Sequence, residues 1–394
     1  MGGVLQGIRV LDFGRYIAGP YCACLLGDMG AEVIRIEKLA GSEDRYVASI
    51  GAGGEGANFI AVNRNKKSMT LNPTKPEGRE IVKKLVATAD VVVANLPPET
   101  LLQMGLDYDS LVQSKPDIIL TTANAYGSGG PYSNRVGFDG IGQVMCGNAY
   151  LSGTPEIPTK AWVPWVDFGT ASLSAFGTLA ALMARAQTGK GQKVEGALLK
   201  TALAFMNATI VEQAVTQIDR KATMNRGQNA APADIFQTKD GWIISQVIGQ
   251  PLYERWAKLM GEEHWLTDAR FKDDDSRGQH GDLISARMAQ WCAERTTAEI
   301  LQTLEAARIP GGPVYSPQQT LEDPHINAIG FLQPTDYPGL PKPAPLADVP
   351  ITLSHTPGSI RCRAPLLGEH TDDIMRSLGY SPEEIAVLRA KRVI

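Results

Sequence analysis

Short apolar runs alternate with stretches of helical spacing along the first third of the chain. Strand-like runs lie at 8–13, 31–36, 90–94 and 118–122, and helix-like stretches lie at 21–29 and 77–89. Such an alternation of strand and helix patterns predicts an α/β fold, in which crossover helices connect the strands of a parallel sheet. Sheets of this kind bind ligands at the carboxyl ends of their strands.

The later part of the chain has longer helical patterns and then a change of character. A helix rich in small residues is predicted over 168–187, with a glycine stop at Gly189, and a second helix over 197–217. After a linker at 226–232, a strand is expected at 241–247, followed by helices up to Ala307. The Pro-rich stretch 337–350 predicts an extended connection without regular structure, and the pattern from Ser381 to Glu384 predicts the cap of a last helix.

Length and charge narrow the classes of protein. A chain of 394 residues is long enough for two domains. Its 38 basic and 42 acidic residues give a net charge of −4 and are scattered in mixed groups, which gives no reason to expect nucleic acid or a membrane as a partner. The five cysteines lack zinc-site spacing and the first residues lack an export pattern, so a reduced, soluble, cytoplasmic protein is expected.

Several cofactor motifs are missing from the sequence. The turn from Gly14 to Pro20 lacks the G-x-G-x-x-G spacing of dinucleotide sites, and no phosphate-binding P-loop occurs. The five histidines are not placed together at ligand spacing, so no metal site and no permanently bound cofactor are expected. The basic group Arg64, Lys66 and Lys67 is interpreted as a solvated edge, with nucleotide phosphates as the alternative.

Asp167 is the main candidate for chemistry, because it lies between aromatic residues directly ahead of the predicted long helix. One interpretation makes it the N-cap of that helix. The other makes it a nucleophile, which the helix dipole keeps ionised and which burial among Trp162, Trp165 and Phe168 strips of water. The sequence leaves both interpretations open.

Motifs spread over nearly the whole chain resemble those of the class III CoA-transferases, the group of formyl-CoA transferase and carnitine CoA-transferase. The matching segments are 10–13, 18–20, 30–37, Asn63, 66–71, 76–78, 90–95, 104–105, 126–127, 130–131 and 188–194, together with 363–371 near the end.

The resemblance implies an α/β fold with a large Rossmann-like domain, a smaller α+β domain and an interlocked homodimer of ring-shaped subunits. The large CoA-binding domain is expected to take 1–224, the small domain 225–330, and a connection returning to the large domain 331–394. In that family the aspartate matching Asp167 forms an acid anhydride with the acyl group and then a thioester with CoA. The expected substrates are therefore an acyl-CoA, with succinyl-CoA as the hypothesis, and a small carboxylic acid.

The resemblance also implies the residues that contact the substrates. CoA is expected along Arg15, Ile17, Ala18, Lys38, Leu71, Thr74, Asn95, Leu96, Gln103, Met104 and Phe138. Formyl-CoA transferase differs at Arg15, Ile17 and Gln103, which indicates a different substrate preference. A second carboxylate on the substrate is expected near Arg15, Arg226, Gly249 and Gln250. The glycine loop that covers the active site of formyl-CoA transferase is matched only weakly, at 247–251.

Two alternatives remain at this point. An α-methylacyl-CoA racemase shares the aspartate, but it also needs a histidine base, and Phe138 stands at the matching position here. A catalytically silent CoA-binding protein is the other alternative, and it would leave Asp167 without a role.

Overall fold

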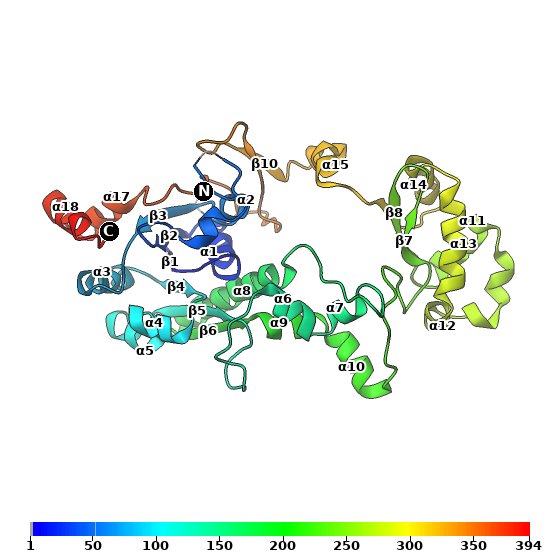
Figure 1. Ribbon diagram of the computed structural model, residues 1–394, viewed down its shortest axis with the longest axis horizontal. Helices are drawn as coiled ribbons and strands as arrows, with labels where there is room; N and C mark the ends of the chain where they lie inside the picture. The colour runs from blue at the N-terminus through cyan, green and yellow to red at the C-terminus, as the bar shows by residue number, and fades with distance from the viewer. Residues whose placement is uncertain (1–2, 52) are drawn as a thin grey trace. The chain divides into compact units, whose positions relative to one another are not determined.

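The computed structural model describes residues 3–51 and 53–394. Its contacts divide the chain into two compact units (Figure 1). The first unit contains residues 1–146, 161–208 and 329–394, and the second contains 147–160 and 209–328. The second unit therefore also takes 147–160 and 209–224, which the sequence analysis assigned to the large domain.

A six-stranded parallel sheet forms the centre of the first unit, with the strand order β3-β2-β1-β4-β5-β6. Its strands are β1 (Arg9–Asp12), β2 (Glu32–Glu37), β3 (Lys66–Thr70), β4 (Val91–Ala94), β5 (Ile119–Asn124) and β6 (Lys193–Ala197). In the register, Leu11 of β1 lies between Ile34 of β2 and Val92 of β4. This is the order of a Rossmann-like doubly wound sheet, and it reverses between β1 and β4, where such folds bind ligands.

Helices cover both faces of this sheet because its strands are apolar on both sides. One face packs against α3 and the two last helices, and the other packs against α1 and α8. The helices of this unit are α1 (Ala18–Asp28), α2 (Ala57–Val62), α3 (Pro76–Ala87), α4 (Pro98–Met104), α5 (Tyr108–Ser114), α6 (Asp139–Met145), α8 (Trp165–Thr188), α9 (Leu198–Phe205), α17 (Thr371–Ser377) and α18 (Pro382–Ala390), with a 3₁₀ turn at Glu43–Tyr46. A hairpin of β10 (Leu332–Thr335) and β11 (Ala344–Ala347) completes the unit.

The second unit has its own core around a three-stranded antiparallel sheet of β7 (Ala233–Gln237), β8 (Trp242–Gln246) and β9 (Gly311–Pro313). Trp256, Ile284 and Met288 are buried in that core. The remaining helices are α7 (Asn148–Leu151), α11 (Gln250–Met260), α12 (Asp274–Gln279), α13 (Gly281–Ala293), α14 (Thr297–Ala306), α15 (Pro317–Glu322) and α16 (Pro324–Ala328), with 3₁₀ turns at Glu263–Thr267 and Ala269–Phe271. The helix α10 (Asn207–Thr216) lies at the boundary between the two units.

The observed elements confirm most of the predicted ones, correct two and add strands that were missed. The strands β1, β2, β4 and β5 and the helix α3 were predicted, and Gly189 ends α8 in the left-handed conformation. The helical stretch predicted over 197–217 is confirmed as two helices, α9 and α10, which a turn at Met206 separates. The Pro-rich stretch 337–350 is not free of regular structure, since it contains β11. The strand β3 was missed, and so was β6.

A buried layer of ion pairs lies at one end of the sheet. The Lys66 Nζ atom donates to Asp12 Oδ2 at 2.7 Å, and Arg64 Nη2 pairs with Asp28 Oδ2 at 2.6 Å. Both basic side chains are buried, so the prediction of a solvated edge was wrong for them and holds only for Lys67, which is exposed. Because they are buried, Arg64 and Lys66 cannot contact nucleotide phosphates either.

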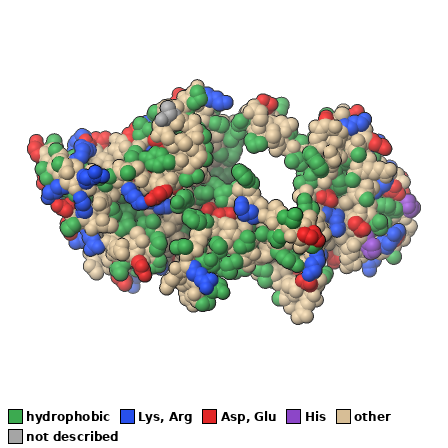
Figure 2. Space-filling view, in the orientation of Figure 1, with side chains coloured by type: hydrophobic (Ala, Val, Ile, Leu, Met, Phe, Trp, Pro, Cys, Tyr) green, Lys and Arg blue, Asp and Glu red, His purple; other side chains and the backbone are tan. Residues whose placement is uncertain are grey.

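Two surface features bear on the class of protein. On the face shown in Figure 2, basic and acidic side chains are interspersed, in line with the mixed charge pattern of the sequence. The helix α8 is long and apolar enough to cross a membrane by length and composition alone. Its residues Val166, Ala171 and Ala181 are nevertheless buried, and α8 packs on α1, as a core helix does.

Candidate active site

The turn after β1 forms the start of the site at the point where the strand order reverses. Asn95, which follows β4, holds this turn: Arg15 N donates to Asn95 Oδ1 at 2.6 Å, and Asn95 Nδ2 donates to Arg15 O at 2.8 Å. Gly14 N donates to Asp12 Oδ1 at 2.7 Å, and a Cβ at Gly14 would lie 2.8 Å from that same oxygen. The turn is therefore tight enough to require a glycine.

Asp167 lies in the first turn of α8, not at its N-cap. The helix begins at Trp165, the N-cap position belongs to Pro164, and Asp167 is the third helical residue. The cap comes instead from Asp139, whose Oδ1 accepts from Val166 N at 2.8 Å and from Asp167 N at 3.0 Å. The N-cap interpretation of Asp167 was wrong, and its carboxylate makes no hydrogen bond to a residue of the described ranges.

A second side chain fixes Asp139 in turn. Gln143 Nε2 donates to Asp139 Oδ2 at 2.5 Å, and Gln143 Oε1 accepts from Ala161 N at 2.8 Å. Asp139 and Gln143 are both buried, so the segment leading into α8 is anchored at two points. Sequence reasoning missed both residues, although an aspartate directly after Gly137 and Phe138, ahead of a helical pattern, was a usable signal.

The surroundings of Asp167 favour its neutral form. Burial raises the pKa of the Asp167 carboxyl group to about 7, and the nearby Asp139 carboxylate adds to the increase. The expectation that the helix dipole keeps Asp167 ionised is therefore not met below neutral pH. Trp165 and Phe168 are half-buried beside Asp167, whereas Trp162 is 94% exposed and does not shield it.

Asp167 opens into a cavity of about 280 Å³. The rings of Tyr16 and Phe138, at a centroid distance of 5.4 Å, meet edge to face at its wall. Tyr16 has a backbone φ of +61°, a left-handed conformation that is uncommon for a bulky residue. Arg135 lines the same cavity and stacks on the ring of Tyr132 at 4.0 Å. The sequence analysis had singled out neither Tyr16 nor Arg135.

A larger cavity of about 700 Å³ adjoins the first, because Arg15, Leu96 and Pro97 line both. Nine of the eleven residues expected to contact CoA line one or both cavities: Arg15, Ala18, Lys38, Leu71, Thr74, Asn95, Leu96, Met104 and Phe138. Ile17 and Gln103 line neither: Ile17 is buried at the start of α1, and Gln103 is exposed. The structure thus brings most of the predicted set together around two adjoining cavities, the smaller of which Asp167 also lines.

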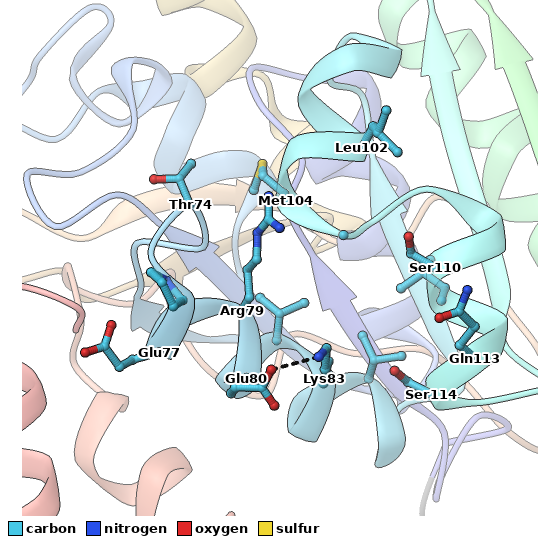
Figure 3. A pocket seen from close by; sticks show the side chains of 15 residues that line it. Thr74, Glu77, Arg79, Glu80, Lys83, Leu102, Met104, Ser110, Gln113 and Ser114 are labelled. Atoms are coloured by element: carbon cyan, nitrogen blue, oxygen red, sulfur yellow. Dashed lines mark hydrogen bonds and ion pairs between the residues drawn. The ribbon is translucent and has the colours of Figure 1, made fainter.

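A third hollow of the first unit, of about 810 Å³, lies between α3 and the α4–α5 segment (Figure 3). Its charged side chains are occupied: Lys83 pairs with Glu80 at 2.7 Å, and Arg79, which extends toward Met104, donates to the carbonyl of Gln103. Asp167 does not line this groove. The chemistry therefore points to the two smaller cavities.

Three residues expected to hold the substrate, Arg226, Gly249 and Gln250, belong to the second unit, whereas Asp167 belongs to the first. Arg226 packs against Gly281, since a Cβ on that glycine would lie 2.7 Å from Arg226 Nη1. Gly249, with a φ of +86°, precedes α11 and donates its N–H to Asp274 Oδ2 at 2.8 Å. Gln250 accepts a hydrogen bond from the buried Arg277, so its carbonyl oxygen is already occupied.

No group of three His, Cys, Asp or Glu side chains suited to a metal ion occurs within residues 3–51 and 53–394. A doubly wound sheet with two adjoining cavities at the switch point of the strand order, one of them lined by an acidic side chain, is the arrangement of an α/β enzyme.

Comparison with known proteins shows to which enzyme family the chain belongs. The model of CoA-transferase family III matches residues 5–371, so the chain belongs to this family and is a CoA-transferase. The resemblance noted in the sequence is thereby confirmed.

Two relatives come from Chloroflexus aurantiacus. The succinyl-CoA–D-citramalate CoA-transferase is 34% identical over 394 residues, covering 99% of this chain and 98% of the relative. The succinyl-CoA–L-malate CoA-transferase beta subunit is 34% identical over 396 residues, with the same coverage. Among solved structures, a CAIB/BAIF family protein from Brucella suis superposes with a TM-score of 0.83 at 30% identity, covering 96% of this chain and 100% of that one.

Proposed function

We propose that this enzyme transfers CoA from succinyl-CoA to a small dicarboxylic acid through covalent intermediates on Asp167. The observation that carries the proposal is that Asp167 lines the smaller of the two adjoining cavities, and that no hydrogen-bond donor of the described residues engages its carboxylate. A nucleophile must have a free lone pair, and this carboxylate has one.

The proposed reaction conserves the energy of the thioester. The Asp167 carboxylate attacks the thioester carbonyl, the C–S bond breaks, and a mixed anhydride forms while the CoA thiolate leaves. The thiolate then attacks the aspartyl carbonyl, which releases succinate and leaves an aspartyl thioester of CoA. The acceptor carboxylate repeats these two steps in reverse order, regenerating Asp167 as its own acyl-CoA departs. Tyr16 and Phe138 at the cavity wall help to exclude water, which would hydrolyse the anhydride.

The substrate class rests on the relatives and on the charges at the cavity. Both Chloroflexus enzymes are named for succinyl-CoA and for a dicarboxylic acid as acceptor. Arg15 and Arg135 are the cations lining the cavity of Asp167, and Arg15 Nη1 already donates to the carbonyls of Phe13 and Gly14 at 3.0 and 2.7 Å. Arg135→Gln should therefore reduce the preference for dicarboxylic over monocarboxylic acceptors, and so should Arg15→Ala. Unchanged preferences in both variants would contradict this assignment.

We also propose that the enzyme works as a homodimer. Phe176 and Met183 on α8 are 71% and 68% exposed, and Val215 on α10 is 78% exposed. Large apolar side chains left exposed along helices are typical of surfaces that another subunit covers. Light scattering of the purified protein at micromolar concentration should give twice the mass of one chain, and a single-chain mass would reject the dimer.

One isotope experiment tests the relay through Asp167. The acceptor acid is labelled with heavy oxygen in its carboxylate groups, and a single turnover is run with succinyl-CoA. A covalent relay leaves one labelled oxygen on the Asp167 peptide, while the succinate released in that turnover is unlabelled. Direct reaction between the two substrates would instead label the succinate and leave Asp167 unlabelled. Exchange of the α-proton with deuterium, without CoA transfer, would favour the racemase.

A further inference from the structure

The end of the chain forms part of the wall of the larger cavity. Arg392 lines this cavity together with Lys38 and Lys75. It follows α18 at a position where the N–H of Arg392 donates to Arg389 O at 2.8 Å and the N–H of Val393 donates to Leu388 O at 2.9 Å. Helices that end in such a turn usually place a glycine there, because the residue takes the left-handed conformation. Arg392 takes it as a non-glycine residue, with a φ of +56°.

The backbone around Arg392 is fixed, although its side chain is exposed. Asn72 N donates to Val393 O at 2.7 Å, and Lys75 Nζ donates to Lys391 O at 2.5 Å. Val393 and Ile394 are buried in the same apolar core as the sheet. The exposed guanidinium therefore starts from a rigid point on the rim of the cavity, which is the geometry of a prepared binding group.

The other charged side chains of this cavity already have hydrogen-bond or ion-pair partners, which for Lys75 is the carbonyl of Lys391. Lys38 forms an ion pair with Glu43, and Glu37 accepts from Arg45 Nη2 at 2.5 Å. Nη1 of Arg15 donates to backbone carbonyls. The guanidinium of Arg392, in contrast, makes no hydrogen bond or ion pair with any residue of the described ranges. It is thus a cation available to an anionic ligand in the cavity that Lys75 also lines.

We propose that Arg392 binds the ribose 3′-phosphate of CoA, so that the enzyme selects CoA over dephospho-CoA. This inference rests on the proposed function, in which CoA thioesters are the substrates. The thioester must reach Asp167 in the smaller cavity, so the pantetheine arm passes the boundary shared by Arg15 and Leu96. The phosphorylated ribose, at the opposite end of CoA, then lies in the larger cavity. Guanidinium groups bind phosphate with paired, charge-assisted hydrogen bonds.

Two substitutions remove the guanidinium without disturbing the turn. Asparagine and glycine both accept a left-handed conformation, so Arg392→Asn and Arg392→Gly should fold as the wild type does. The matched control is Arg389→Gln, which removes one positive charge from α18, where Arg389 pairs with Asp372 outside the cavity. Thermal unfolding of all four proteins verifies that they are folded.

The measurement compares succinyl-CoA with succinyl-dephospho-CoA as donors. In the wild type and the control, loss of the 3′-phosphate should raise KM by about 10- to 100-fold with little change in kcat. In both Arg392 variants, KM for succinyl-CoA should rise by a similar factor, while KM for the dephospho donor stays unchanged, so the preference disappears. An equal rise of KM for both donors, or no rise, would overturn the assignment.

Calorimetric titration with CoA and dephospho-CoA separates this inference from the proposed reaction. If the wild type transfers no CoA but still prefers CoA over dephospho-CoA, and Arg392→Asn loses that preference, the site stands and the proposed reaction fails. If Arg392→Asn binds CoA as tightly as the wild type does, the site is rejected whatever the enzyme catalyses.

Discussion

The carboxylate of Asp139 controls the ionisation of Asp167 as well as the start of α8. It accepts from the N–H groups of Val166 and Asp167, and its charge is the second cause, after burial, of the raised pKa of Asp167. Asp139→Asn keeps an oxygen acceptor of the same shape but removes the charge. We therefore expect the pKa of Asp167 to fall in this variant.

The expected size of that change follows from the distance between the two carboxylates. Asp139 Oδ1 lies 3.0 Å from Asp167 N, which places the two carboxylates within about 6 Å of one another. At an effective dielectric constant of about 40, two charges at this separation interact by about 1.4 kcal/mol, or about one pKa unit. The pKa of Asp167 should thus move from about 7 toward about 6.

The assay is the rate of CoA release from succinyl-CoA in a single turnover, measured from about pH 5 to about pH 9. Asp167 attacks only when ionised, so the wild-type rate should fall about tenfold for each pH unit below its pKa. The midpoint should shift by about one unit toward acid in Asp139→Asn, even if the absolute rate drops because Gln143 loses its partner. The control is Asp107→Asn, the same substitution at the cap of α5, where Asp107 accepts from Ser110 N. An unshifted midpoint in Asp139→Asn would refute the reasoning.

Three further predictions concern catalysis and stability. Asp167→Asn should lose transfer by at least about 10³-fold. Because burial raises the folded pKa of Asp167, the ionised carboxylate destabilises the fold increasingly from about pH 4 to about pH 7. In scanning fluorimetry the variant should therefore melt about 2–4 °C above the wild type at about pH 8 and show no gain at about pH 4. Lys66→Met should lower the free energy of unfolding in urea by about 3–5 kcal/mol, because it leaves Asp12 buried without its cation, whereas Lys67→Met should change it little. Gly14→Ala should raise KM for the acyl-CoA donor in initial-rate assays, since its Cβ would lie 2.8 Å from Asp12 Oδ1, and an unchanged KM would show that the turn can relax.

The sequence predicted those strands whose apolar runs are continuous and failed where charged residues interrupt the apolar pattern. β3 was missed because it begins with Lys66 and Lys67, and a lysine in the core looks polar until its partner Asp12 is known. β6 lies at the edge of the sheet, where Lys193 is exposed and the apolar pattern is weak. The failure at β3 shows that local patterns do not record partners distant in the sequence, and the failure at β6 shows that an exposed edge strand gives only a weak apolar signal.

The candidate site shows the same limit. Asp167 could be singled out from its aromatic neighbours, but its cap and its pKa depend on Asp139, which is 28 residues away. Most of the residues that line the two cavities were predicted from the resemblance to the family. A family resemblance implies a three-dimensional arrangement, which the spacing of residues in one sequence cannot give. It could not supply Arg392, whose position depends on how the end of the chain packs against Asn72.

The contacts between β3 and α17 have a consequence for synthesis in the cell. Ser68 O accepts from the N–H of His370 at 2.9 Å, and Thr70 N donates to Thr371 Oγ1 at 3.1 Å across 301 residues of sequence. At about 5–20 residues per second, a ribosome needs about 15–60 s to make the covering helix after β3 has emerged. Until Ile374 and Met375 arrive, the part of this face of the sheet that they cover remains exposed, and exposed apolar surface is prone to aggregation. The nascent chain should therefore depend on chaperones until translation is nearly finished.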